Sequence, residues 1–233
     1  PGMEPNLDPM EIDVHVTHPA RVIQAGLITS PEYSMKKLLG MGMRKIYTIT
    51  PVFRDAEALG PRNLPEFTLL EWYGVGGYED FMQETEALLR LVLQDASPWK
   101  RLTYEQANVD EFGDPHTQEK RLFVTHYPRE QASLARLDEE GFAQRLEVFA
   151  DGLELCNGFC ELTDAREQRR RFQLEQEERR RMGKRVFPID EELLEALANI
   201  KDSVYGNALG LDRLVMLKYA ASDIRDIQLI QTL

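Results

Sequence analysis

Residues 46–75 read IYTITPVFRDAEALGPRNLPEFTLLEWYGV, and the fold depends on this stretch. Residues 46–53 and 67–75 are rich in β-branched and aromatic side chains, so each predicts a strand. Gly60 and two prolines interrupt the chain between them, which predicts a loop over residues 55–65. Such an arrangement predicts that the second strand returns beside the first.

The rest of the chain predicts more strands separated by helices. Strand patterns cover residues 122–127, 144–150, 153–159 and 204–209, and Asp151-Gly152 is typical of a hairpin turn. Ser30-Pro31-Glu32 can begin a helix that ends at Gly40 and Gly42. Further helices are predicted at residues 79–96, 165–182, 191–199 and 211–219. Residues 1–19 predict only a leading loop. This order of elements predicts one α+β domain, residues 1–233, built on an antiparallel β-sheet flanked by helices.

Charge and composition restrict the partners. The 233 residues carry a net charge of −12, which argues against extensive contact with RNA. No apolar run is long enough to span a membrane. The two cysteines, Cys156 and Cys160, match no zinc pattern and are expected to be buried free thiols in a reducing compartment.

Arginine triplets at 169–171 and 179–181 could suggest a nucleic-acid site. Glutamates four residues earlier favour a solvated helix face instead. The expected pairs are Glu167–Arg171, Glu175–Arg179 and Glu177–Arg181.

Three segments place charged residues among strand residues: 53–73, 154–161 (ELCNGFCE) and 206–213 (GNALGLDR). Burying a charge is costly unless a partner or a ligand compensates it. Internal ion pairs could explain each segment alone, for example Arg54–Glu66 or Arg213–Glu154. A ligand shared by all three segments explains them together and predicts a binding site.

These segments resemble the motifs of the class II aminoacyl-tRNA synthetases. Segment 53–73 resembles motif 2, and segment 206–213 resembles motif 3. With Thr29-Ser30-Pro31-Glu32-Tyr33 and ELCNGFCELTDAREQ, the chain is similar to lysyl-tRNA synthetases, and most of all to truncated paralogues that attach (R)-β-lysine to elongation factor P. The resemblance covers residues 27–104 and 122 to the end.

The resemblance implies an ATP-dependent ligase that forms an aminoacyl-adenylate. Arg54 and Arg213 are then the catalytic residues, on the α- and γ-phosphates of ATP, because a guanidinium is always charged and can bind in a bidentate manner. Glu154 is the expected Mg²⁺ ligand. The other ATP-binding residues are expected to be Glu57, Phe67, which would stack on adenine, Leu155 and Gly210.

The amino acid would need two ammonium pockets. By resemblance, Glu32 holds the amine nearer the carboxylate, and Glu161 with Tyr73 holds the side-chain amine. Asn157 is expected to support the substrate or ATP. Ala208 stands where synthetases usually have the middle glycine of motif 3, and we hypothesise that it selects β-lysine over α-lysine, with Ser30 opposite.

The chain departs from the family pattern in several places. Motif 1 and the tRNA-binding domain are not visible in the sequence, and the segment from Glu105 to Lys120 is short. Ala56 and Leu64 replace residues common in motif 2. The expected partners are elongation factor P as the acceptor, lysine or β-lysine, and a second copy in a homodimer, in the cytoplasm. The alternatives are tRNA aminoacylation and a non-catalytic regulator on the same fold.

Overall fold

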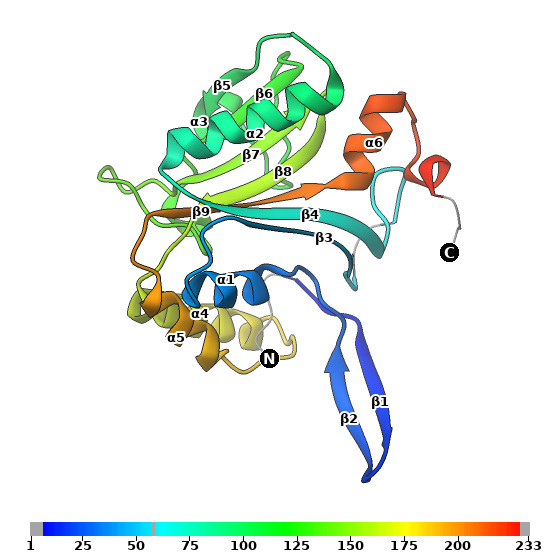
Figure 1. The fold of residues 1–233 in the computed structure, drawn as a ribbon. Coiled ribbons are helices and arrows are strands. Elements are labelled where there is room, and N and C mark those ends of the chain that lie inside the picture. The colour runs from blue at the N-terminus through cyan, green and yellow to red at the C-terminus, as the bar shows by residue number, and fades with distance from the viewer. Residues whose placement is uncertain (1–6, 57–58, 229–233) are drawn as a thin grey trace.

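A computed structural model describes residues 7–56 and 59–228 of the chain, and its centre is one large sheet (Figure 1). Seven strands are hydrogen-bonded in the order β3-β4-β9-β8-β7-β6-β5 within the described residues. Neighbours are antiparallel except β5 and β6, which are parallel. The strands are β3 (Ile46–Phe53), β4 (Glu66–Val75), β5 (Lys100–Thr103), β6 (Arg121–Thr125), β7 (Arg145–Ala150), β8 (Leu153–Cys160) and β9 (Val204–Gly210). The predicted α+β class is confirmed.

Helices lie on both sides of this sheet. Helix α2 (Tyr78–Leu93) covers one side, whereas α1 (Glu32–Gly40), α4 (Ala165–Arg181) and α5 (Glu191–Asn199) gather on the other (Figure 1). Two further helices, α3 (Tyr104–Ala107) and α6 (Leu211–Tyr219), follow β5 and β9 directly. Strand β9 and helix α6 are therefore continuous, which fixes the first turn of α6 at the end of the central strand.

The core explains why these helices sit where they do. On the α2 side, Phe81 and Leu89 are fully buried against Leu146, Val148 and Leu209 of the sheet. On the other side, α5 buries Leu193 and Leu197 against Phe172 of α4. Fully burying such side chains stabilises the fold by about 1.5–3 kcal/mol each.

Helix α1 ends where the sequence predicts. A methyl group at Gly40 would lie 2.7 Å from the Cβ of Ala196, so the close approach of α1 to α5 needs glycine there. Gly42 has a φ of 98°, which L-residues with a side chain rarely adopt.

Residues 7–19 correct one expectation, whereas residues 1–6 lie outside the described part of the chain. Instead of a leading loop, β1 (Glu11–Thr17) and β2 (Ala20–Gly26) form an antiparallel hairpin that projects away from the body (Figure 1). The sequence of this hairpin does not predict strands, because neither face of the hairpin is buried. Ile12, Val14 and Val22 are all exposed.

Helix α4 confirms one predicted ion pair and corrects two. Arg171 binds Glu167 at 3.1 Å, as expected. Arg179 instead binds Asp8 at 2.7 Å, and Arg181 binds Glu178 at 2.6 Å. Helical spacing predicts which acidic residues of the same helix are within reach of each arginine. Arg179 pairs with the sequence-distant Asp8 instead, because Arg179 is buried. Cys156 and Cys160 are buried free thiols, as predicted.

Candidate active site

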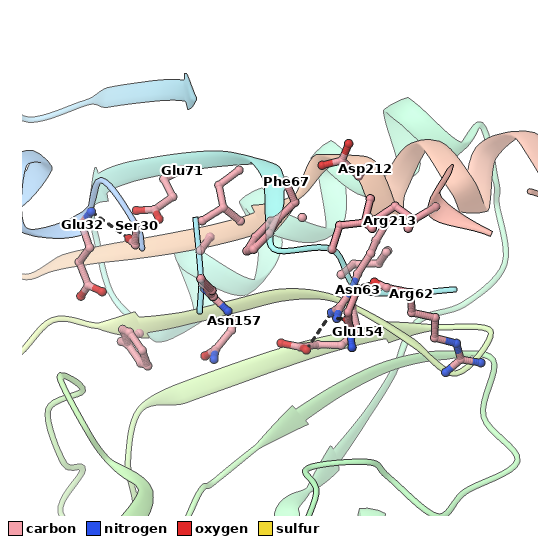
Figure 2. Close-up of a pocket in the computed structure, with 18 residues that line it drawn as sticks. Ser30, Glu32, Arg62, Asn63, Phe67, Glu71, Glu154, Asn157, Asp212 and Arg213 are labelled. Atoms are coloured by element: carbon pink, nitrogen blue, oxygen red, sulfur yellow. Dashed lines mark hydrogen bonds and ion pairs between the residues drawn. The ribbon is translucent and has the colours of Figure 1, made fainter. Parts of the chain in front are cut away.

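An elongated cavity lies over β4, β8 and β9, between the starts of α1 and α6 (Figure 2). Ser30, Glu32 and Glu71 lie at one end, which we call the amine end. Arg213, Glu154, Asn63 and Asp212 lie at the other, which we call the phosphate end (Figure 2). Segments far apart in the sequence thus line the two ends of one cavity.

Arg213 organises the phosphate end. It stands in the first turn of α6, and its Nη1 donates to the Glu154 carboxylate at 3.0 Å. Its Nη2 donates to Asn63 Oδ1 at 2.6 Å. Beside it, the Asp212 carboxylate accepts the backbone N–H of Thr68 at 2.6 Å. Helix α6 and strand β4 are therefore joined directly, and the guanidinium is held in a fixed place.

Arg54 and Phe67 also line the phosphate end. The Arg54 guanidinium lies 5.0 Å from the centroid of the Phe67 ring, which is a cation–π distance. Arg54 follows β3, and its backbone N–H donates to the carbonyl of Pro65 at 2.8 Å. The pairing of β3 with β4 thus brings together two residues separated by a loop. With Arg62 and Arg213, three guanidinium groups line the same end.

Glu154 provides a carboxylate suited to a cation bound with phosphate. Its side chain is 37% exposed, so solvent or a ligand can reach it. Among the described residues, no cluster of three or more His, Cys, Asp or Glu side chains could hold a metal ion. Mg²⁺ commonly uses one or two carboxylates together with phosphate oxygens and water, and Glu154 fits that mode.

Glu71 is the central residue of the amine end. It is 1% exposed yet lines the cavity. Its Oε1 accepts the Ser30 hydroxyl at 2.6 Å, and its Oε2 accepts the Tyr73 hydroxyl at 3.3 Å. The Ser30 oxygen also accepts the backbone N–H of Glu32 at 3.0 Å. Ser30 therefore links the Glu71 carboxylate to the backbone at the start of α1.

Glu32 is also joined to a lysine of the protein itself. The Lys36 ammonium, one turn along α1, forms an ion pair with Glu32 and another with Glu161 at 2.6 Å. Burial raises the pKa of Glu161 to about 7, although the charge of Lys36 opposes the rise. Burial alone would lower the pKa of Lys36, but the two carboxylates more than offset it and raise that pKa.

Glu161 and Tyr73, which are expected to hold the side-chain amine, lie close to each other at Gly206. Neither lines the cavity among the described residues. A methyl group at Gly206 would lie 2.2 Å from Tyr73 Cε1 and 2.5 Å from Glu161 Oε1. Glycine is required at Gly206 because these two side chains occupy the space.

Ala208 lies between the two walls of the cavity. In the sheet it is opposite Glu71 of β4 on one side and Asn157 of β8 on the other. The Asn157 oxygen accepts Arg145 Nε at 3.2 Å, and Arg145 is also paired with Glu147. A methyl group at position 208 therefore occupies space next to both Glu71 and Asn157.

The structure brings most of the predicted site residues together. Ten of them line the cavity: Ser30, Glu32, Arg54, Phe67, Glu154, Leu155, Asn157, Ala208, Gly210 and Arg213. Glu57 lies outside the described residues. For Gly210, an added methyl group would come no closer than 3.6 Å to Arg213, so the protein itself does not demand glycine there.

Sequence reasoning missed several residues of the site. The most important are Glu71, Asn63 and Asp212, which line the cavity and make the bonds described above. Glu71 carried a usable signal, because it is a carboxylate in the middle of the apolar run LLEWY. Asn63 lies in a loop, where an amide is ordinary, and nothing local distinguishes it.

Comparison with known proteins agrees with this geometry. Residues 14–230 match the model of the tRNA synthetases class II (D, K and N). The chain is 37% identical to a protein of Salmonella dublin named elongation factor P–(R)-β-lysine ligase, over 86% of this chain and 75% of that protein. Proteins of the same name from Salmonella paratyphi B and Salmonella enteritidis match equally well, at 37% identity over the same shares. Within residues 7–56 and 59–228, no helix is both long and apolar enough to cross a membrane.

Proposed function

The chain belongs to the class II tRNA synthetases of the D, K and N group, and on that premise we propose that it is an ATP-dependent ligase that activates (R)-β-lysine or lysine and transfers it to elongation factor P. One observation supports this most strongly. A single cavity is lined by three arginines and an aromatic ring, with the carboxylates of Glu154 and Asp212, at one end and by the carboxylates of Glu32 and Glu71 at the other. ATP is anionic, and a diamino acid carries two ammonium groups, so the two ends suit the two substrates.

The first reaction is adenylation. A carboxylate oxygen of the amino acid attacks the α-phosphorus of ATP, the bond from that phosphorus to the bridging oxygen breaks, and pyrophosphate leaves. Such transfer depends on positioning and on cancelling negative charge. Arg54 would bind the α-phosphate and Arg213 the γ-phosphate, with adenine on Phe67. Glu154 would hold Mg²⁺, which neutralises phosphate charge when bound.

The second reaction is transfer. A lysine side-chain nitrogen of the acceptor attacks the carbonyl carbon of the adenylate, an amide bond forms, AMP leaves, and the nitrogen loses a proton to solvent. Because the acceptor is a translation factor, the reaction would take place in the cytoplasm.

At the amine end, Glu32 is our candidate for the amine nearer the carboxylate, and Glu161 with Tyr73 is our candidate for the side-chain amine. Glu71, which accepts the Tyr73 hydroxyl, lines the cavity together with Glu32. A buried carboxylate discriminates strongly against an analogue that lacks the amine, because the analogue leaves it unpaired. Ser30 donates its hydroxyl to Glu71 and accepts the backbone N–H of Glu32, so it holds the start of α1 against Glu71.

We also propose a homodimer, with residues 7–228 forming one catalytic domain. Support comes from apolar side chains exposed on the β1–β2 hairpin and on β3, which is an edge strand of the sheet. Tyr47 is 73% exposed and Ile49 56% exposed. Exposed apolar residues on an edge strand favour association with another chain. Light scattering should give twice the mass of one chain.

Pyrophosphate exchange tests the proposed reaction. We expect exchange with (R)-β-lysine or α-lysine, and little with norleucine, which lacks the side-chain amine. Labelled amino acid should then appear on elongation factor P and not on tRNA. Labelling of tRNA instead would identify a synthetase, and no exchange with any lysine isomer would identify a non-catalytic relative.

A further inference from the structure

The backbone on both sides of Arg54 is held by the chain that leads into and out of the β1–β2 hairpin. The N–H of Phe53 donates to the carbonyl of Ile28 at 2.8 Å, and the N–H of Asp55 donates to the carbonyl of Asp8 at 2.8 Å. Asp8 and Asp55 also form an isolated antiparallel bridge. The two ends of the hairpin therefore lie against the end of β3, directly beside Arg54.

Asp8 is held in turn by a buried arginine of α4. Arg179 is 5% exposed, and its Nη2 donates to Asp8 Oδ1 at 2.7 Å. Its Nη1 donates to the carbonyl of Leu7 at 3.4 Å, and its Nε donates to that of Arg185 at 2.7 Å. The planar guanidinium thus binds one carboxylate and two backbone carbonyls at once, a task for which its fixed fork of donors is suited.

The burial of Arg179 sets it apart from other arginines of α4. Arg170 and Arg181 are exposed and pair with glutamates within one turn of the same helix. Burying a guanidinium is costly unless its partners compensate the charge. Hydrogen bonds from Lys184 and, after it, from Arg179 hold the pKa of Asp8 below its usual value, although burial opposes them. The buried pair therefore joins α4 firmly to the segment that binds the backbone beside Arg54.

We propose that Arg179 is a positioning residue for adenylation, and that through Asp8 it holds the backbone from which the Arg54 guanidinium reaches the α-phosphate. This rests on the proposed function, in which Arg54 binds that phosphate. Among the described residues, Arg179 does not line the cavity, so it acts without touching either substrate. The proposal makes a specific claim: the effect of Arg179 on adenylation depends on the side chain of Arg54.

A double-mutant cycle tests this dependence. Arg179→Met should slow pyrophosphate exchange roughly tenfold or more, because a catalytic group displaced by about 1 Å can lose about 10²-fold in rate. The affinity for lysine should change less than about twofold, since the amine end is held by other contacts. In an Arg54→Ala background, Arg179→Met should slow pyrophosphate exchange by no more than about twofold further.

The matched control is Lys184→Met. Lys184 donates to the other oxygen of Asp8 at 2.8 Å, but its side chain is 37% exposed. An exposed pair contributes little, so this variant should keep the wild-type rate within about twofold. Thermal unfolding shows which variants are folded. If Arg179→Met does not fold, Asp8→Asn tests the same link from its more exposed side, and it should slow pyrophosphate exchange without changing lysine affinity.

Hydrogen exchange of backbone amides gives a readout that does not need the reaction. Arg179→Met should speed exchange at the amide of Asp55 and leave unchanged that of Leu162, which is bonded to the carbonyl of Leu134 at 2.9 Å. An unchanged Asp55 amide, or equal acceleration at both amides, would overturn the proposal.

The cycle has its own contrary outcome. If Arg179→Met slowed pyrophosphate exchange as much in the Arg54→Ala background as in the wild type, Arg179 would act by another route and the proposal would be wrong. If the wild type catalysed no pyrophosphate exchange with any lysine isomer, the proposed function would fail, and the amide of Asp55 would still decide whether Arg179 holds this backbone.

Discussion

The two ends of the cavity are built differently, although both concentrate charge. At the phosphate end, Arg213 and Glu154 are partly exposed and make bonds that a ligand could replace. At the amine end, Glu71, Lys36 and Glu161 are almost completely buried, Lys36 is paired with Glu161, and Glu71 accepts the Ser30 hydroxyl. Exposed charge is screened by water, and buried charge is not. The phosphate end should therefore tolerate varied anions, whereas the amine end should be sensitive to each charge.

The largest effect is expected at the amine end, from Glu71→Gln. Loss of a buried, hydrogen-bonded charge should weaken lysine binding by about 2–5 kcal/mol while ATP binding stays nearly unchanged. Calorimetry with each ligand measures both. The control is Glu84→Gln, because Glu84 also accepts a tyrosine hydroxyl, from Tyr205 at 2.6 Å, but does not line the cavity. Equal losses for lysine and ATP would contradict the division into two ends.

Arg54→Ala tests the phosphate end. Removing a donor that stabilises developing charge should slow pyrophosphate exchange about 10²–10³-fold, with little change in lysine affinity. Arg44→Ala is the control, because Arg44 pairs with Asp202 at the surface. If Arg54→Ala weakened lysine binding as much as it slowed exchange, the two ends would not be independent.

Ala208→Gly tests a residue placed between Glu71 and Asn157. We expect the ratio of β-lysine to α-lysine adenylation efficiency to fall, by about 1–3 kcal/mol of discrimination for one methyl group. Steady-state pyrophosphate exchange with both isomers gives the ratio, and thermal unfolding shows whether the variant is folded. An unchanged ratio in a folded variant would make Ala208 a packing residue.

The last prediction, with the smallest expected effect, concerns the affinity for tRNA. The net charge is −12, and many arginines of α4 are paired with acidic residues. We expect binding no tighter than the non-specific range of about 10⁻⁴–10⁻⁶ M at physiological salt. A filter-binding assay over a salt series measures this. Tight, salt-sensitive binding of tRNA would show that the protein also binds anions at its surface, outside the cavity.

The sequence allowed most of the fold to be predicted where one face of an element is buried. Residues 191–199 form α5 as expected, because Leu193, Leu194 and Leu197 recur on one side. The β1–β2 hairpin was missed because both of its faces are exposed and no buried face marks it. Short elements such as β5 and α3 were also missed, since four residues carry little periodicity.

The site shows the same division between local and tertiary information. Its motif residues, such as Arg54, Glu154 and Arg213, are identified by the residues around them in the chain, and the sequence alone placed them in one site. The partners of buried charges are not identified in this way. Many carboxylates were possible partners for Lys36, and Arg179 had Glu175 at a favourable spacing yet binds Asp8. An ion pair depends on distance in space and on exclusion of water, so only the tertiary structure decided that Lys36 joins Glu32 to Glu161 and that Glu71 lines the cavity.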